Sequence, residues 1–199
     1  RSLRSGKTQV VTEHIDCFTP TGLRLKSGQE LEADIIVTAT GLNMRLMGGA
    51  EFYVDNQPID FAEKFSYKGM MYADIPNLIQ TFGYINASWT LRADLTAEYA
   101  CRLINRIDEL GADYCVARLA DEDSNMMAKP WIENFSAGYI QRSLDLMPKQ
   151  GEEDPWRNTQ NYALDKKIIR DAPLEDGVMT FVDVVVTDDS SDSGASSNN

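Results

Sequence analysis

The residues best suited to chemistry lie at a predicted junction between a strand and a helix, in the sequence TFGYINASWTL. A short apolar strand at 78–82 is followed by Gly83, and a long helix is expected from about residue 87. The first turn of a helix has unpaired backbone N–H groups, whose positive potential suits an anionic or electron-rich ligand edge. Two interpretations of Asn86 and Ser88 stay open, because both could cap the helix or contact a ligand.

A second candidate lies at the end of another predicted strand, in the sequence ADIIVTATGLN at 33–43. The strand at 34–39 is apolar on both faces, which is typical of a strand covered on both sides. It ends in small residues, including Thr40 and Gly41. A glycine in this place predicts that another group approaches the backbone closely, or that φ is positive there.

The helix that must position the first candidate is predicted to run from about 87 to 110. Glu98 stands four residues before Arg102, the order that favours an ion pair along a helix, and Gly111 is a natural end. Five apolar side chains recur at helical spacing on one side: Leu91, Leu95, Leu103, Ile107 and Leu110. Four charged side chains lie off this apolar side and are expected on the outside: Arg92, Glu98, Arg102 and Arg106.

The segments around these candidates read as short strands. Residues 8–18 and 23–26 flank a Thr-Pro-Thr-Gly turn, and a second turn leads toward the strand at 34–39, so a small β-meander is expected. A hairpin-like element at 51–60 is predicted to turn at Asp55-Asn56. Together with the long helix, these elements predict an α/β fold.

Composition excludes several classes of partner. The 199 residues include 31 acidic and 19 basic side chains, for a net charge of −12. Nucleic acids and anionic membranes need clustered Lys and Arg, so neither is expected as a partner. Apolar runs stay short of the roughly 20 residues of a membrane helix, and no signal peptide is recognised. We therefore expect a cytoplasmic protein.

Cysteine and histidine are too sparse for a metal or disulfide framework. The three cysteines, Cys17, Cys101 and Cys115, form no C-x-x-C motif, and His14 is the single histidine. The sequence therefore predicts reduced thiols and no metal site.

Longer motifs resemble a known family. The stretch DIIVTATGLN, followed by YKGMMYADIPNLIQTFGYINASWTLRADLTAEYACRLIN, resembles the C-terminal half of flavin-containing monooxygenases, and most nearly their Baeyer–Villiger type. FSAGYIQRSLDLMPKQG, PWRNTQNY and LEDGVMTF extend the resemblance, which covers about residues 3–183.

The resemblance implies the C-terminal portions of a two-dinucleotide-binding, Rossmann-like flavoprotein with FAD and NADPH as cofactors. On this basis residues 1–41 end the NADPH domain and 42–111 return into the FAD domain. Residues 112–184 form a C-terminal extension and 185–199 a disordered acidic tail. The implied cofactor-binding residues are Thr40, Gly41, Gly83, Asn86, Ala87, Ser88 and Trp89.

The implied reaction uses NADPH and O2 and places one oxygen atom on a small apolar substrate, either a ketone or a soft sulfur or nitrogen. No catalytic residue is assigned, because the arginine that the family uses is expected upstream of Arg1, and Arg1 and Arg4 do not match it. The G-x-G-x-x-G turns and the F-x-G-x-x-x-H fingerprint of the family are also absent here. The chain is thus expected to be part of a longer enzyme. Alone, we expect it to lack FAD and activity, and to be poorly soluble or a homo-oligomer.

Two other kinds of protein remain open as interpretations. One is another two-domain FAD/NAD(P) oxidoreductase, such as a pyridine-nucleotide disulfide reductase. The other is a truncated, non-catalytic binding or assembly module. Trp131, Phe135 and Tyr139 recur every four residues and predict a helix face in the core rather than a substrate wall. Core packing is also favoured over a substrate cavity for four methionines: Met44, Met47, Met70 and Met71.

Overall fold

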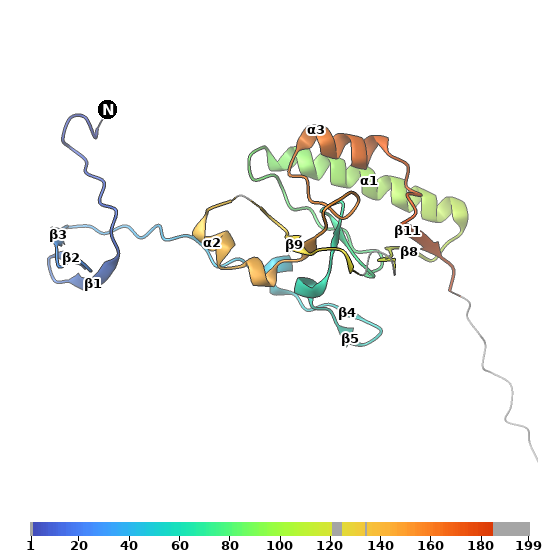
Figure 1. Ribbon diagram of the computed structural model, residues 1–199, viewed down its shortest axis with the longest axis horizontal. Helices are drawn as coiled ribbons and strands as arrows, with labels where there is room; N and C mark the ends of the chain where they lie inside the picture. Colours follow the sequence, from blue (N-terminus) through green and yellow to red (C-terminus); the bar gives the residue numbers. More distant parts are fainter. Residues whose placement is uncertain (1, 121–124, 134, 185–199) are drawn as a thin grey trace, which may run out of the picture. The chain divides into compact units, whose positions relative to one another are not determined.

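The computed structural model describes residues 2–120, 125–133 and 135–184 (Figure 1). The acidic tail predicted at 185–199 lies outside the described residues. The chain divides into two compact units, Arg1–Leu42 and Asn43–Asn199.

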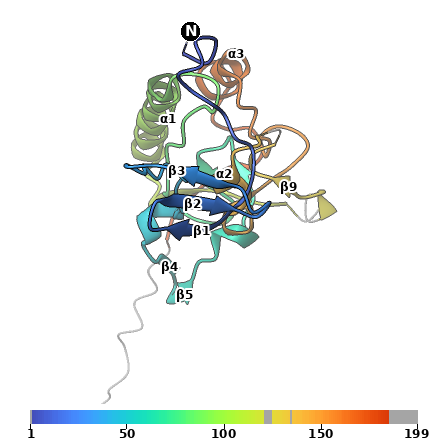
Figure 2. The same ribbon diagram turned by 90° about the vertical axis from the view of Figure 1, so that its left-hand side faces the viewer.

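The first unit holds the predicted meander. Its strands are β1 (Ile15–Thr19), β2 (Gly22–Leu25) and β3 (Glu30–Glu32), which form an antiparallel sheet in the order β1-β2-β3 (Figure 2). A Cβ atom at Gly22 would lie 2.0 Å from the carbonyl oxygen of Leu31, so only glycine lets β3 pass this closely. The meander is confirmed, although β1 begins at Ile15 and not near residue 8.

The predicted buried strand at 34–39 is wrong. These residues form no strand, and the side chains of Ile35 and Val37 are 81% and 82% exposed. A strand that is apolar on both faces needs paired neighbours and covering elements. In the first unit the sheet closes at three strands, and none of its described residues pairs with this segment.

The core of the second unit is built around the tight hairpin of β6 (Ser66–Tyr67) and β7 (Met71–Tyr72). Every residue from 65 to 73 is buried. This hairpin packs in one cluster with buried side chains of the long helix α1 (Trp89–Leu110) and of β8 (Tyr114–Ala117), which pairs antiparallel with β11 (Met179–Val182). The core therefore joins segments from the start, middle and end of the unit.

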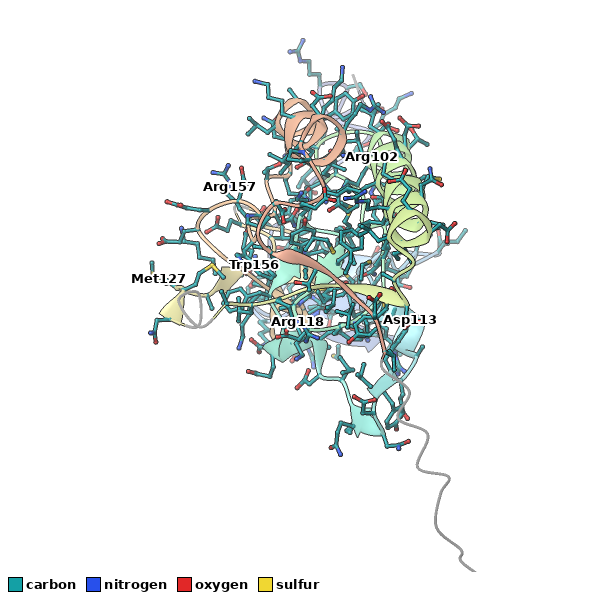
Figure 3. The ribbon with its side chains drawn as sticks, turned by 90° about the vertical axis from the view of Figure 1, so that its right-hand side faces the viewer. Arg102, Asp113, Arg118, Met127, Trp156 and Arg157 are labelled. Carbon is teal, nitrogen blue, oxygen red and sulfur yellow. The ribbon has the colours of Figure 1, made fainter. Side chains whose placement is uncertain are left out.

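A helical layer lies along α1. Helix α3 (Tyr162–Asp165) continues into the helical turn η5 (Lys166–Asp171), and Figure 1 shows this pair running beside α1. Arg102 projects from α1 toward the pair (Figure 3) and donates hydrogen bonds of 2.8 and 2.9 Å to the carbonyl oxygens of Ile169 and Arg170. These bonds satisfy carbonyls at the end of η5 that have no helical partner.

The remaining elements are short. The hairpin of β4 (Tyr53–Val54) and β5 (Gln57–Pro58) turns at Asp55 and Asn56, whose φ angles of 50° and 62° confirm the predicted turn. The others are η1 (Leu46–Gly49), η2 (Phe61–Glu63), β9 (Lys129–Pro130), α2 (Gly138–Gln141), η4 (Leu144–Leu146) and β10 (Lys149–Gln150).

The long helix is confirmed almost to the residue. It begins at Trp89 rather than about residue 87, and Gly111 ends it in the left-handed conformation with φ 69°. Its buried side, however, is shifted from the predicted one. Leu95 and Leu103 are buried as expected, but Leu91 and Leu110 are exposed.

The charged side of the helix also departs from the prediction. Arg92, expected on the outside, is buried. Glu98 does not pair with Arg102. Its carboxylate accepts a hydrogen bond from Arg170 in η5 instead, while Arg102 is drawn to the carbonyl groups of that turn. Packing against a neighbouring helix thus outweighs a weak pair within α1.

Two further predictions are wrong. Residues 78–82 form no strand, since none of the described strands pairs with them. Among the described residues of 131–139 only the last two are helical, because α2 begins at Gly138. The aromatic side chains nevertheless pack in a core cluster as predicted, with Trp131 fully buried. The methionines also lie in or against core clusters, as expected: Met44, Met47, Met70 and Met71.

The described residues form a mixed α/β structure with small antiparallel sheets, which confirms the fold class at that level. A two-dinucleotide, Rossmann-like arrangement stays a prediction. Across these residues, no helix combines the length and the apolar character that crossing a membrane requires.

Candidate functional site

The candidate site in the second unit is the turn at 83–89 that leads into α1. The ring of Trp89 folds back over Gly83, where a Cβ atom would lie 2.1 Å from the Cγ atom of Trp89. The same ring lies 5.2 Å, centroid to centroid, from Phe82. Gly83 is therefore small to admit an aromatic ring.

The outer part of this turn is open. Asn86, Ala87, Ser88 and Trp89 are exposed, and 56% of Trp89 is accessible. Ser88 is the cap of α1, since its hydroxyl oxygen accepts a hydrogen bond of 3.3 Å from the Thr90 N–H. We call residues 86–89 the outer edge.

The outer edge also presents backbone donors. Within the described part of the chain, the N–H groups of Asn86, Ala87 and Ser88 form no hydrogen bond. They precede a helix of 22 residues, whose dipole adds positive potential at this end. The arrangement can therefore donate hydrogen bonds to an electron-rich edge of a ligand.

The inner part of the turn is fastened to the C-terminal third of the chain. The Tyr84 hydroxyl donates to the Asp165 carboxylate at 2.7 Å, and the Ile85 N–H donates to the Gln160 side-chain oxygen at 3.0 Å. Burial, and then the hydrogen bond to Asp165, raise the pKa of Tyr84 above its ordinary value, so the hydroxyl stays protonated as a donor. We call these contacts the inner anchors.

A buried ion pair lies beneath the inner anchors. The side chains of Arg92 and Asp165 are 2% and 1% exposed and contact each other directly. Arg92 also donates to the carbonyl oxygen of Lys68, and its guanidinium lies 5.8 Å from the centre of the Tyr84 ring. Gly69 leaves room for this guanidinium, because a Cβ atom there would lie 2.7 Å from it.

A second buried cluster ties the C-terminal strand region to the β6–β7 hairpin. The Tyr67 hydroxyl donates to the Asp176 carboxylate at 2.6 Å and lies 2.9 Å from the Tyr99 hydroxyl, while Lys68 Nζ lies 3.0 Å from the same carboxylate. Burial lowers the pKa of Lys68, an effect that Asp176 opposes. Burial would raise the pKa of Asp176, but the hydrogen bond from Tyr67 and the other contacts outweigh it and lower that pKa.

The other predicted site residues belong to the first unit. Thr40 and Gly41 are exposed, at the end of the extended segment. The φ angle of Gly41 is +91°, which confirms the expected positive φ and explains the choice of glycine there.

Sequence reasoning missed Arg92, Asp165 and Gln160. One signal was available for Arg92, because a helical face through residues 92, 95, 96, 99 and 103 contains every buried position of α1. Asp165 and Gln160 carry no such local signal, since their partners lie 73 to 81 residues away.

The described residues contain no group of three or more His, Cys, Asp or Glu side chains that could hold an ion. The three cysteines are free thiols.

Comparison with known proteins identifies relatives of one kind. No family model matches the chain. It is 49% identical over 181 residues to the FAD-containing monooxygenase EthA of Mycobacterium tuberculosis, and 44% identical over 181 residues to EthA of Mycolicibacterium smegmatis. It is also 44% identical over 185 residues to the "Probable FAD-binding monooxygenase AlmA" of an Acinetobacter species.

Each of these alignments covers 91% of this chain but only 36% of the relative. The chain thus spans about a third of the length of the curated relatives it matches. Those relatives are named FAD-containing or probable FAD-binding monooxygenases, and the chain is similar to one part of each.

Proposed function

We propose that this chain is part of an FAD-dependent monooxygenase and that the turn at 83–89 contacts the flavin ring. The observation that carries the proposal is the contrast within this turn, whose inner part is anchored while its outer edge is open with free N–H groups. The 49% identity to an FAD-containing monooxygenase over nearly the whole chain supports it.

The residues present fit a flavin in this role. Unpaired N–H groups at the outer edge match the carbonyl and nitrogen acceptors along one edge of the flavin ring. The exposed ring of Trp89 offers an apolar surface beside them. The chain contains no G-x-G-x-x-G turn to cradle a pyrophosphate, so it would orient the ring rather than anchor the phosphates.

Further parts of the proposal concern the whole enzyme. Residues 1–41 would belong to an NADPH domain, 42–111 to the FAD domain and 112–184 to an extension, arranged as a two-dinucleotide flavoprotein. Thr40 and Gly41 would then lie between the cofactors. FAD, when bound, supplies the redox chemistry that couples NADPH oxidation to the use of O2. One oxygen atom would pass to a ketone, in a Baeyer–Villiger reaction, or to sulfur or nitrogen, in the cytoplasm.

The role of this chain's residues would be to bind and to exclude water. The outer edge donates hydrogen bonds that hold the ring in one orientation, and Trp89 with Phe82 covers adjacent apolar surface. The ion pair of Arg92 and Asp165 keeps the underlying backbone in place. No residue of this chain is assigned a proton-transfer step.

The test uses the longer protein that carries this chain. We expect it to bind FAD, to turn over NADPH continuously only with O2 present, and to oxygenate either a simple ketone or a thioether. Ala87→Glu, at the outer edge, should lower FAD occupancy, because it adds a carboxylate next to the flavin acceptors. Ala97→Glu adds the same charge on the exposed side of α1 and should leave occupancy unchanged.

Absence of bound flavin in the wild-type protein would contradict the proposal. Equal loss of FAD in Ala87→Glu and Ala97→Glu would contradict the assignment of the turn. The chain of 199 residues, expressed alone, should carry no stoichiometric FAD.

A further inference from the structure

Of the two inner anchors, the one nearer the outer edge is made by a side-chain amide. Ile85 is the last residue before the outer edge, and its N–H donates to the Gln160 side-chain oxygen at 3.0 Å. The two residues are 75 positions apart in the sequence. The bond fixes the orientation of the peptide group between Tyr84 and Ile85, one residue before the outer edge.

Gln160 is itself held in place by a buried neighbour. Its side-chain nitrogen donates to the Asn158 Oδ1 atom at 3.2 Å. Asn158 is only 7% exposed, and its side-chain nitrogen donates to the Trp131 carbonyl oxygen at 2.9 Å. The side-chain amide of Gln160 is therefore oriented toward Ile85 by its hydrogen bond to Asn158, which is itself held by Trp131.

The hydrogen bond of Tyr84 also ties the turn to this C-terminal segment. Tyr84, one residue earlier, is fastened to Asp165, which also accepts a hydrogen bond of 2.5 Å from the Thr159 hydroxyl. Two consecutive residues of the turn are thus bonded to the segment 159–165, whereas the next four are exposed. One short C-terminal segment determines the path of the turn.

We propose that Gln160 is a positioning residue for the flavin contact. It acts through the Ile85 N–H, which it orients, and so sets the direction in which the outer edge presents its donors. The inference rests on the proposed function, because it assumes that the outer edge meets the flavin. On this basis the segment 158–165, although distant in sequence, determines how tightly and in what orientation the flavin ring is held.

The test compares matched variants of the longer, FAD-loaded protein. Gln160→Met keeps the length of the side chain and removes both hydrogen bonds, whereas Gln160→Glu keeps the acceptor for the Ile85 N–H. The control is Asn77→Leu, because Asn77 also accepts a 3.0 Å bond from a backbone N–H, that of Cys115. Asn77 and Gln160 share left-handed backbone conformations, with φ 54° and 48°.

Three quantities are measured for each variant: the dissociation constant for FAD, the visible absorption spectrum of the bound flavin, and the unfolding midpoint. We expect Gln160→Met to raise the dissociation constant roughly five-fold, as for the loss of one hydrogen bond, and to shift the spectrum. Gln160→Glu should fall between wild type and Gln160→Met in both, because it keeps the acceptor for the Ile85 N–H but loses the donor to Asn158. Asn77→Leu should lower the midpoint as much as Gln160→Met does, but leave FAD affinity and the spectrum unchanged.

Tyr84→Phe provides a second variant if Gln160→Met fails to fold. It removes the hydroxyl from the adjacent inner anchor and should weaken FAD binding in the same direction. Unchanged affinity and spectrum in the folded variant used, or equal FAD loss in Asn77→Leu, would overturn the inference while the wild type still binds FAD. A wild-type protein that binds no FAD would overturn the proposed function and this inference with it.

Discussion

Two apolar segments of this chain have opposite environments. The segment at 33–41 contains three consecutive branched aliphatic residues and is exposed throughout. The segment at 65–73 contains Ser66 and Lys68, yet every one of its residues is buried. The difference shows that burial is decided by the elements that pack around a segment. The second segment contacts α1 and the end of the chain, whereas the first has no described strand beside it.

The largest expected effect concerns the buried ion pair of Arg92 and Asp165, which contacts the second segment at the Lys68 carbonyl. In the longer protein, Arg92→Ala should lower the free energy of unfolding by about 3–5 kcal/mol, because it leaves the Asp165 carboxylate buried without its cation. Arg170→Ala is the matched control. Arg170 pairs with the exposed Asp94 and the partly exposed Glu98, so its loss should cost at most about 1 kcal/mol. Chemical denaturation measures both, and equal losses would contradict the assigned burial.

The contrast in burial between the two segments is tested by truncating one apolar side chain in the first segment and one that packs against the second, in the chain of 199 residues. Leu95→Ala, in the core against the second segment, should cost about 2–5 kcal/mol. Val37→Ala, in the exposed segment, should change stability by less than about 0.5 kcal/mol. A comparable loss for Val37→Ala would show that the first segment is buried by a partner element.

A smaller effect is expected at the turn. Gly83→Ala should cost about 1–3 kcal/mol, because the new methyl group would overlap the Trp89 ring. The double variant Gly83→Ala with Trp89→Ala should lose less than the sum of the two single variants, since the overlap is gone. Additive losses in thermal or chemical denaturation would mean that the ring does not pack on Gly83.

The smallest effect is a dependence on pH. The pKa of Asp176 is lower in the folded state than its ordinary value of about 3.9, so its contribution to stability is complete above that value. It is lost as the pH falls through the lower, folded pKa. Asp176→Asn should therefore flatten the acid side of the curve of unfolding midpoint against pH. An unchanged acid slope would exclude Asp176 as a contributor.

Local features of the fold were predictable from the sequence. Ser88 and Gly111 mark the ends of α1 because caps depend on the few residues around them. The Asp55-Asn56 turn follows from the same kind of local rule. The predicted strand at 34–39 failed because strand formation depends on distant partners that its own residues do not specify.

The candidate site was predictable only in part. The turn and its exposed residues follow from a strand-like segment, a glycine and a capped helix start. The inner anchors could not be predicted, because Gln160 and Asp165 meet the turn through the fold of the C-terminal third. Arg92 was assigned to the wrong face, since a charged residue is expected in solvent unless its partner is known.

The central claim, that the outer edge contacts FAD, is tested most directly by hydrogen–deuterium exchange of the longer protein with and without FAD. The free N–H groups of Asn86, Ala87 and Ser88 should exchange rapidly without FAD and become protected when it binds. The equally exposed β4–β5 turn at Asp55-Asn56 should exchange at the same rate in both states. Unchanged exchange at 86–89 in a protein saturated with FAD would contradict the claim.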